Sequence, residues 1–308
     1  MEIPPILFLV FNRPTHTRKV FETIRVQKPK HLFIASDGAR NGNENDEINV
    51  SLVREIVKDI DWDCEVNTLF RDKNLGCKTA VSEAITWFFN HIDEGIILED
   101  DCLPDPSFFN FCGSLLDKYR FNDKVMAISG SNLLTKREGY NSSYVFGLGG
   151  IWGWATWKRA WNLYDLSMAG WNDPKIKNRV KAQLKSNWYK HYYHMFDAAF
   201  NQSLNTWDIQ WFYAILYNEK LAINPAVNLV QNIGFDANGT HSHGKELFAL
   251  TEKKEAINFP LIHPDKLKID YQYLDLLYSE TSSGEKRNIF KSVLKKVYRA
   301  SITLTKKK

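Results

Sequence analysis

Three consecutive carboxylates, Glu99, Asp100 and Asp101, directly follow the apolar residues 95–98. Three neighbouring negative charges repel one another, so keeping them together costs free energy unless a positive charge lies among them. A divalent cation such as Mn²⁺ or Mg²⁺ supplies that charge and binds carboxylate and phosphate oxygens at the same time. The pattern therefore predicts a cation site that also binds phosphate. The alternative is a solvated acidic turn before Pro104.

The elements around these acids decide where they lie. The apolar run at 95–98 is typical of a strand buried on both faces, and open α/β sheets bind ligands at the carboxyl ends of their strands. Similar runs occur at residues 5–11, 31–36 and 65–70, with helical patterns between them. This alternation predicts right-handed βαβ units and a Rossmann-like α/β fold, with a mostly parallel central sheet flanked by helices. In the helical pattern at 46–59, the inward residues are expected to be Ile48, Leu52, Val53, Ile56 and Val57.

Parallel strands bring their carboxyl ends to one edge of the sheet, so we expect the groups that follow them to converge. These groups are Asn12, Arg13, Asp37, Arg71, Glu99, Asp100 and Asp101. A surface that carries arginines for phosphate and acids for a base and a metal favours a nucleotide-diphosphate site. The glycine-rich dinucleotide and P-loop motifs are missing from the sequence, so those two kinds of site are not supported. The alternatives are an Asx turn at Asp37 and a solvated loop charge at Arg13.

The second half of the chain carries aromatic and histidine candidates. Residues 147–157 contain four glycines and three tryptophans. Glycine lets the backbone approach a ligand, and aromatic faces stack on sugar rings. We interpret Trp152, Trp154 and Trp207 as an acceptor-binding wall, with a place in the hydrophobic core as the alternative. His241 and His243 lie in a turn-rich loop and are candidate metal or phosphate ligands.

These segments together resemble a known family. The pattern Leu98-Glu-Asp-Asp-Cys-Leu-x-Pro-Asp-x-x-Phe-Phe109 is similar to the N-acetylglucosaminyltransferase I branch of the GT-A fold glycosyltransferases. The likeness covers about residues 5 to 245. Its further segments, which follow in the family's order, are 5–14, 37–38, 74–76, 146–150, 207–208, 224–225 and 242–244.

The resemblance implies a metal-dependent, inverting transfer of a sugar from a nucleotide-diphosphate donor to a hydroxyl of a glycan or lipid-linked acceptor. The donor it implies is a UDP-sugar such as UDP-GlcNAc. The implied roles are nucleotide contacts for Asn12, Arg13, Asp37, Arg71 and Asn74, ribose and water-shell contacts for Glu99 and Asp100, the metal for Asp101, and the catalytic base for Asp208. His241 is implied at the metal or diphosphate, with His243 as the alternative.

Three alternatives stay open beside this family assignment. For Asp208 the alternative to the catalytic base is the N-cap of a helix, a position at which aspartate is common. A sugar nucleotidyltransferase has the same fold, although its glycine-rich phosphate loop has no counterpart at residues 12–14. A non-catalytic glycan-binding module is the third alternative.

The composition limits how many domains the chain can form and which kinds of partner it can bind. With 308 residues and 44% hydrophobic content, the chain is long enough for one large core. We expect one catalytic domain at 1–280, with a nucleotide-sugar half at 1–130 and an acceptor half at 131–280, followed by a basic tail at 281–308. The net charge of the whole chain is +4. Residues 286–308 contain nine Lys and Arg and no acid, so residues 1–285 carry a net charge of about 4 − 9 = −5. Nucleic-acid binding by the whole protein is therefore not expected.

The basic tail and the cysteines indicate in which cellular compartment the protein is expected. Apolar residues at helical spacing in the tail predict a basic helix that either lies on an anionic membrane surface or is an exposed end of the chain. The four cysteines have no C-x-x-C spacing, which favours reduced thiols. The first residues show no basic stretch followed by a cleavable apolar segment. We expect a cytoplasmic protein, with the tail at the inner membrane face under the first alternative.

Overall fold

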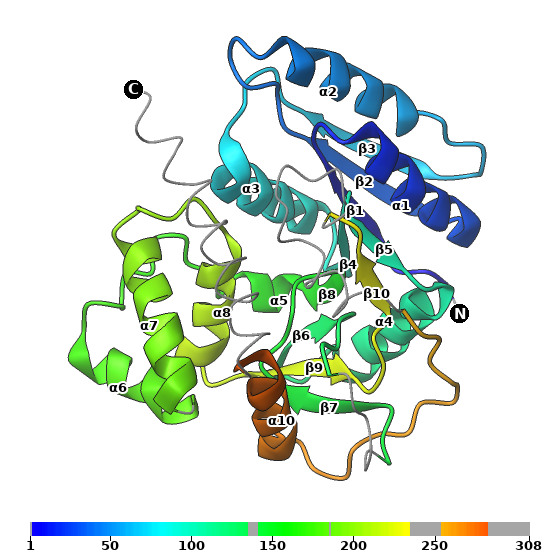
Figure 1. Cartoon of the computed structure of the whole chain (residues 1–308). Helices are drawn as coiled ribbons and strands as arrows, with labels where there is room; N and C mark the ends of the chain where they lie inside the picture. Colours follow the sequence, from blue (N-terminus) through cyan, green and yellow to red (C-terminus); the bar gives the residue numbers. More distant parts are fainter. Residues whose placement is uncertain (1, 135–140, 185, 235–253, 283–308) are drawn as a thin grey trace.

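One eight-stranded sheet draws its strands from both halves of the chain. The computed structural model describes residues 2–134, 141–184, 186–234 and 254–282 (Figure 1). In spatial order the strands are β3 (Glu65–Phe70), β2 (His31–Ser36), β1 (Ile6–Val10), β4 (Glu94–Glu99), β8 (Trp154–Trp157), β6 (Val125–Ser129), β9 (Leu221–Pro225) and β7 (Tyr144–Gly147). β8 and β7 run antiparallel to their neighbours. A small second sheet pairs β5 (Cys102–Pro104) with β10 (Val230–Asn232). The mixed, mostly parallel sheet confirms the predicted fold class.

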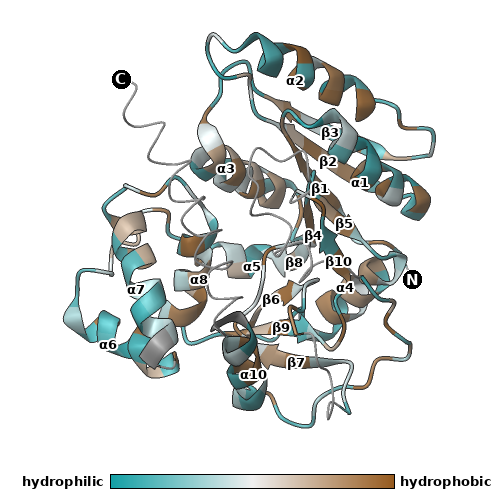
Figure 2. Cartoon of the chain, viewed as in Figure 1, coloured by the Kyte–Doolittle hydropathy of each residue, from teal (hydrophilic) through white to brown (hydrophobic). Residues whose placement is uncertain are grey.

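Helices cover both faces of this sheet (Figure 1). Alternate residues of β1 point to opposite faces, so Phe8 packs with one core and Leu9 with the other. The helices of the first face are α1 (Pro14–Gln27), α2 (Glu44–Ile56) and α4 (Pro106–Tyr119). Those of the second are α3 (Gly76–His91), α5 (Lys158–Trp161) and α8 (Asp208–Tyr217). The strands between the two layers are largely apolar (Figure 2).

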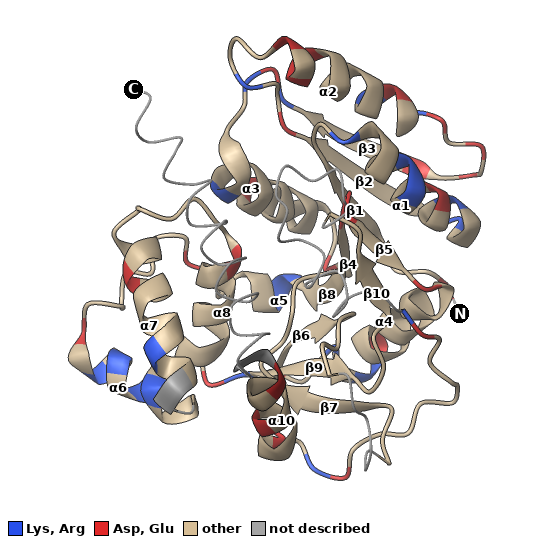
Figure 3. Ribbon diagram, in the orientation of Figure 1, with Lys and Arg blue, Asp and Glu red and all other residues tan. Residues whose placement is uncertain are grey.

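The remaining helices extend the second half of the chain. They are α6 (Pro174–Gln183), α7 (Ser186–Phe200) and α10 (Tyr271–Ser282). Lys and Arg gather on α6 and on α1 (Figure 3). None of the described helices combines the length and the apolar character that a membrane span requires. Except for the end of α10, the predicted basic tail lies outside the described residues, so membrane binding and the cytoplasmic location stay predictions.

The inner face of α2 differs from its predicted one. Ile48 and Leu52 are 60% and 49% exposed, so their assignment to the inner face was wrong. Val53, Ile56 and Val57 are buried as predicted, and Val50 and Asp46 are buried in addition. The buried Asp46 carboxylate accepts hydrogen bonds from two loops at the edge of the sheet. A buried polar contact of this kind is invisible to apolar periodicity.

The order of the strands changes direction between β1 and β4. From β1 the chain moves outward to β2 and β3, then returns to place β4 on the other side of β1. The register pairs Val10 with Ser36 and Leu9 with Glu99, which brings the carboxyl ends of β2, β1 and β4 level. Such a topological switch point is where open α/β sheets bind ligands.

Candidate functional site

The arginine that follows β1 contacts the two aspartates that follow β4 at the switch point. Nη1 of Arg13 donates to Oδ2 of Asp101 at 3.0 Å, and Nη2 donates to Oδ1 of Asp100. The backbone N–H of Phe11 donates to the other Asp100 oxygen at 3.3 Å. The Arg13 side chain is 38% exposed and that of Asp101 is 16% exposed. Residues that the sequence places 87 positions apart are therefore in direct, partly solvent-accessible contact.

The charges in this cluster do not balance. Desolvation, followed by the charges of Asp101 and Asp100, raises the pKa of Glu99. Desolvation also raises the pKa of Asp100, against the opposite effect of Arg13. One guanidinium cannot neutralise three ionised carboxylates, so these raised pKa values indicate a place where an additional cation would favour the ionised forms.

The chemistry of the cluster fits a hard divalent cation. Mg²⁺ and related ions bind carboxylate oxygens, and in phosphate-binding sites they commonly take one or two protein carboxylates together with substrate oxygens. Asp101 offers such an oxygen at the accessible side of the cluster. Across the described ranges, no group of three His, Cys, Asp or Glu side chains is arranged as a metal site. Predicted ligands His241 and His243 lie outside the described residues.

The chain leading to those histidines passes beside the ion pair. Gly234 is the last described residue before 235–253. A Cβ atom at Gly234 would lie 2.5 Å from Oδ2 of Asp101 and 3.1 Å from Nη1 of Arg13. Only glycine lets the backbone approach the cluster this closely.

Asp37 contacts the first turn of α3. Its two oxygens accept hydrogen bonds from the backbone N–H groups of Gly38 and Gly76 at 3.0 Å and of Leu75 at 3.0 and 3.1 Å. Asn74 supports the same loop by donating from Nδ2 to the Gly38 carbonyl at 2.8 Å. Asp37 therefore combines the local turn contact with a cap on a helix from another part of the chain. Its role toward a nucleobase stays a prediction.

Truncation of Asp37 tests this capping contact. Asp37→Ala is expected to lower the free energy of unfolding by about 1–2 kcal/mol, because backbone donors at the start of α3 lose their acceptor. Urea denaturation followed by circular dichroism measures the change. Asp72→Ala, at an exposed position in the loop after β3, is the control and should stay within about 0.5 kcal/mol of the wild type. Equal losses in the two variants would contradict the cap.

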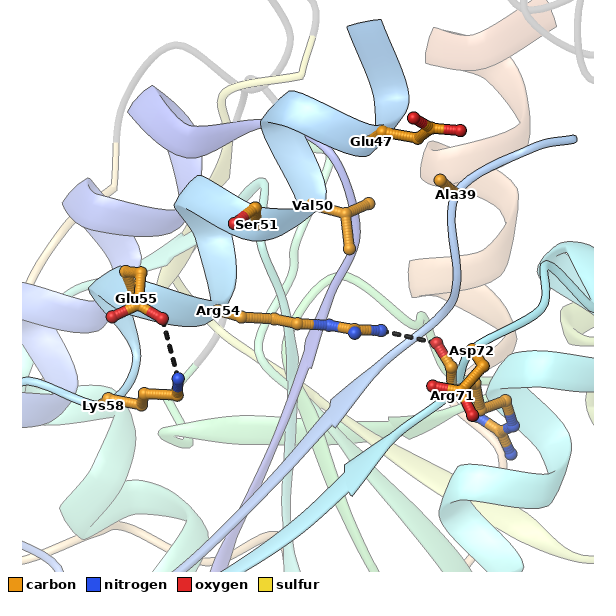
Figure 4. Close-up of a pocket in the computed structure, with 9 residues that line it drawn as sticks. All are labelled: Ala39, Glu47, Val50, Ser51, Arg54, Glu55, Lys58, Arg71 and Asp72. Atoms are coloured by element: carbon orange, nitrogen blue, oxygen red, sulfur yellow. Dashed lines mark hydrogen bonds and ion pairs between the residues drawn. The ribbon is translucent and has the colours of Figure 1, made fainter. Parts of the chain in front are cut away.

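Arg71 points toward α3 and borders a separate pocket. Its guanidinium donates to the Ala80 carbonyl at 3.4 Å and to Glu83 at 3.2 Å. Its own carbonyl accepts from Arg54 at 2.6 Å. Arg54 and Arg71 line a pocket of about 330 Å³ between α2 and the loop after β3 (Figure 4). Because three acidic and three basic side chains line this pocket, it has no net charge to attract a nucleotide.

Asp208 lies close to the acidic cluster. It is the first residue of α8, whose N-cap position belongs to Trp207, so Asp208 is not the N-cap. Desolvation raises the pKa of Asp208, against a hydrogen bond that its Oδ1 accepts from Thr206. The pKa of Glu99 is raised mainly by desolvation and by the charges of Asp101 and Asp100, and the charge of Asp208 adds to this. The Asn205 side chain, which accepts from the Lys78 N–H at 3.2 Å, ties the start of α8 to α3.

Cys77 directly follows Gly76, whose N–H contacts Asp37, and was missed by sequence reasoning. This exposed residue lies in the first turn of α3. Desolvation raises the pKa of its thiol, and the charges of Glu99, Asp208, Asp101 and Asp37 raise it further. These acids belong to two strand ends, those of β4 and β2, and to α8. The place of Cys77 directly after residues 74–76 was the only sequence signal.

The predicted acceptor wall is wrong for two of its three tryptophans. Trp154 and Trp207 are 1% and 2% exposed, and their rings stack with centroids 5.6 Å apart. Both belong to the second core, because β8 is an interior strand covered on that face by α5 and α8. The nearby glycines serve packing: a Cβ at Gly150 would lie 2.7 Å from the Ser129 and Ser131 hydroxyls. Trp152 is partly exposed, and its role stays a prediction.

Comparisons with known proteins show distant structural likeness. No protein-family model matches the chain, and no curated protein matches it significantly. The apo form of mouse xyloside xylosyltransferase 1 is similar over 84% of this chain and 99% of its own, with 11% identity and a TM-score of 0.37. A UDP-glucose pyrophosphorylase complexed with UDP-glucose shares 14% identity over 47% of this chain and 63% of its own, with a TM-score of 0.26. An inositol-1-phosphate CTP transferase from T. maritima shares 9% identity over 53% and 74%, with a TM-score of 0.32.

Proposed function

We propose that the protein is a metal-dependent, inverting glycosyltransferase that uses a UDP-sugar, such as UDP-GlcNAc, and a glycan or lipid-linked acceptor. The observation that carries this proposal is the contact of Arg13 with Asp100 and Asp101 at the switch point, with Asp208 close by. In this proposal Arg13 and a cation held by the carboxylates stabilise the departing diphosphate. The desolvated Asp208 carboxylate takes the proton from the acceptor hydroxyl.

The β1–β4 junction is the proposed diphosphate site. Arg13 is partly exposed and has N–H groups left to bind phosphate oxygens. Mn²⁺ or Mg²⁺ held by Asp101 would supply charge stabilisation to the departing nucleoside diphosphate. Asp100 keeps Arg13 in place, because its carboxylate is anchored by the Phe11 N–H.

Asp208 is the proposed general base. The acceptor oxygen forms a bond to the anomeric carbon on the face opposite the diphosphate, while the bond from that carbon to the diphosphate oxygen breaks. The electron pair leaves with the nucleoside diphosphate, and the acceptor proton moves to the Asp208 carboxylate. Attack from the opposite face inverts the anomeric configuration. A raised pKa makes Asp208 a stronger base than an ordinary aspartate.

A screen of nucleotide sugars tests the proposed function. The full chain is incubated with single donors and a mixed set of sugar acceptors, with Mn²⁺ or with EDTA, and released UDP, GDP or CMP is measured. Metal-dependent release of UDP is the expected result. Pyrophosphate release from UTP and a sugar 1-phosphate would instead indicate a nucleotidyltransferase. Glycan binding without any nucleotide release would indicate a binding module, and either result would overturn the proposal.

Thiol labelling reports where the donor binds. Maleimide modification of Cys77 is expected to slow at least ~10-fold when UDP and Mn²⁺ saturate the protein, because only the ligand-free fraction reacts. Mass spectrometry of the labelled peptides measures the rate at each cysteine. Cys64, directly before the amino end of β3, is the internal control and should react at an unchanged rate. Equal Cys77 rates with and without ligand would place the nucleotide elsewhere.

A further inference from the structure

Helices α6 and α7 form a basic region on a protein that is otherwise acidic. Residues 174–196, which include all of α6 and most of α7, contain six Lys and Arg and no Asp or Glu. The rest of residues 1–285 therefore carries a net charge of about −5 − 6 = −11. Figure 3 shows the basic side chains of α6 together at one side of the molecule. This concentration of charge calls for a physical explanation, because like charges on one surface repel one another.

The two helices lie side by side and run in opposite directions. Nζ of Lys177 lies 5.1 Å from the ring centroid of Tyr193, and Nζ of Lys181 lies 5.8 Å from that of Tyr189. The two lysines are about one helical turn apart, and the two tyrosines follow in the reverse order, so the pair is antiparallel. Lys177 is used within the pair, because its Nζ also lies 3.5 Å from Oδ1 of Asp197.

One side of this helix pair is packed against α8, and the opposite side is exposed. Val180, Leu184 and Phe196 share a hydrophobic core with residues of α8. The exposed positions 175, 178 and 181 of α6 recur at helical spacing on the side away from Val180. On α7 the exposed positions 190 and 194 are one turn apart, on the side away from Phe196. Figure 1 shows the pair at the outside of the molecule, beyond α8.

The exposed side of the pair carries positive charge without paired acids. We define the α6–α7 face as the exposed Lys175, Asn178, Lys181, Lys190 and His194, with the partly exposed Tyr189 and Tyr193 beside them. Among the described residues, the ion pair of these two helices is that of Lys177 with Asp197, which leaves the three exposed lysines for a partner.

Lysines and tyrosines on one exposed face fit an anionic lipid surface. The stem of a lysine lies along apolar material while its amine reaches charged headgroups. Tyrosine is common at the boundary between membrane and water, because its ring is apolar and its hydroxyl is polar. Each basic residue near an anionic membrane raises the affinity roughly fivefold. A long polyanion in solution would extend past the face onto the acidic remainder of the protein, which disfavours it as the partner.

Helix α7 also contacts the surroundings of the proposed base. The ring of Tyr192, on the inner side of α7, lies with its centroid 4.5 Å from that of Phe212. Phe212 is one turn after Asp208 in α8. Burial raises the pKa of the Tyr192 hydroxyl, and the charge of Asp208 adds to this effect. The helix that turns Lys190 outward therefore packs on α8 beside the proposed base.

We propose that the α6–α7 face binds an anionic lipid surface, and that the acceptor is a lipid-linked glycan presented at that surface. The second part rests on the proposed function, and the first part does not. The face is separate in sequence from the basic tail at 281–308, so its contribution to lipid binding can be removed while the tail is kept.

Vesicle flotation with the full chain tests the first part. Vesicles of phosphatidylcholine with phosphatidylglycerol should bind the wild type at least ~10-fold more tightly than vesicles of phosphatidylcholine alone. The triple variant Lys175→Gln, Lys181→Gln, Lys190→Gln should lower the partition coefficient onto the anionic vesicles at least ~20-fold, because each lysine contributes roughly fivefold. The tail is present in both proteins, so its own contribution cancels in this ratio.

The matched control removes three positive charges from another basic surface. Arg18→Gln, Lys19→Gln and Lys28→Gln change exposed residues of α1 and its C-cap, and Figure 1 places α1 on the side of the sheet away from α6 and α7. This variant has the same net charge as the first and should stay within ~2-fold of the wild type, because salt screens charges that do not approach the lipid. Equal losses in the two variants would reflect net charge alone and would overturn the docking face.

Kinetics with two forms of one acceptor test the second part. Transfer to a water-soluble sugar acceptor should have the same kcat and KM in the wild type and in the lysine triple variant. KM for a glycolipid that carries the same sugar in phosphatidylglycerol vesicles should rise at least ~10-fold in the variant. An unchanged KM for the glycolipid would overturn the lipid-linked acceptor.

The outcomes separate this inference from the proposed function. Anionic vesicles that bind the wild type and the lysine triple variant equally would overturn the docking face, while metal-dependent sugar transfer still stands. Binding to a sulfated polysaccharide but not to vesicles would overturn it as well, since the partner would be a soluble polyanion. A chain that releases no nucleoside diphosphate from any donor, but loses vesicle binding in the triple variant, would keep the docking face and overturn the proposed function together with the acceptor.

Discussion

Replacing Asp208 by asparagine is expected to lower kcat for sugar transfer by about 10²–10⁴-fold, the usual contribution of a general base. Asparagine has nearly the same size and still accepts the hydrogen bond from Thr206, but it does not take up the acceptor proton. Donor binding does not depend on that proton, so the affinity for UDP should stay unchanged. Steady-state kinetics at saturating donor and calorimetry with UDP measure the two quantities.

The matched control for this variant is Asp123→Asn. Asp123 is an exposed aspartate before the amino end of β6, at the edge of the sheet opposite the site, and its variant should keep wild-type kinetics. A large loss in both variants would point to an unspecific effect. Near-native turnover of Asp208→Asn would show that another group deprotonates the acceptor.

The pH profile gives a second test of the base. Asp208 acts only when ionised, so kcat rises with pH as the carboxylate loses its proton. Because desolvation raises the pKa of Asp208, this limb should lie above the range of an ordinary aspartate. The residual activity of Asp208→Asn should lack the limb. A limb that persists in the variant would assign it to another group.

Replacing Asp101 by alanine is expected to weaken UDP binding in Mn²⁺ by at least ~100-fold, since even the outer partners of metal ligands contribute 10–100-fold. The remaining affinity should equal that of the wild type in EDTA, because Arg13 and the nucleobase contacts are still present. Titration calorimetry of UDP, with Mn²⁺ and with EDTA, measures both values.

A surface variant shows whether the Asp101 effect is local. Asp117→Ala removes an aspartate of α4 whose side chain is 74% exposed, and it should leave binding unchanged. Thermal unfolding of both variants establishes that they fold. UDP binding by Asp101→Ala that still responds to Mn²⁺ as in the wild type would place the cation on other ligands.

Parallel strands explain why the core of the site was predictable. Four apolar runs separated by helical patterns determine a sheet whose strand ends share one edge, so the Arg13 loop and the acids after β4 had to come close. The prediction required no knowledge of side-chain packing, only the direction of the strands. The same reasoning does not reveal what each side chain contacts at that edge.

Packing decided the parts that the sequence left open. Asp37 accepts hydrogen bonds from N–H groups at the start of α3, and the buried Asp46 accepts them from Asn12 and Arg40. The neighbouring residues in the sequence do not predict either contact. Trp154 was placed in the core because β8 inserts between β4 and β6, a pairing between residues distant in the chain.

The amino-acid sequence by itself determined the alternation of elements, the α/β class and the presence of acids after a buried strand, because these depend on local periodicity and residue type. The tertiary structure alone decided which acids pair with Arg13, that Asp208 and Cys77 join them, and which oxygens remain free. Those properties depend on desolvation and on contacts between distant segments, and they arise only when the sheet and both helix layers are assembled.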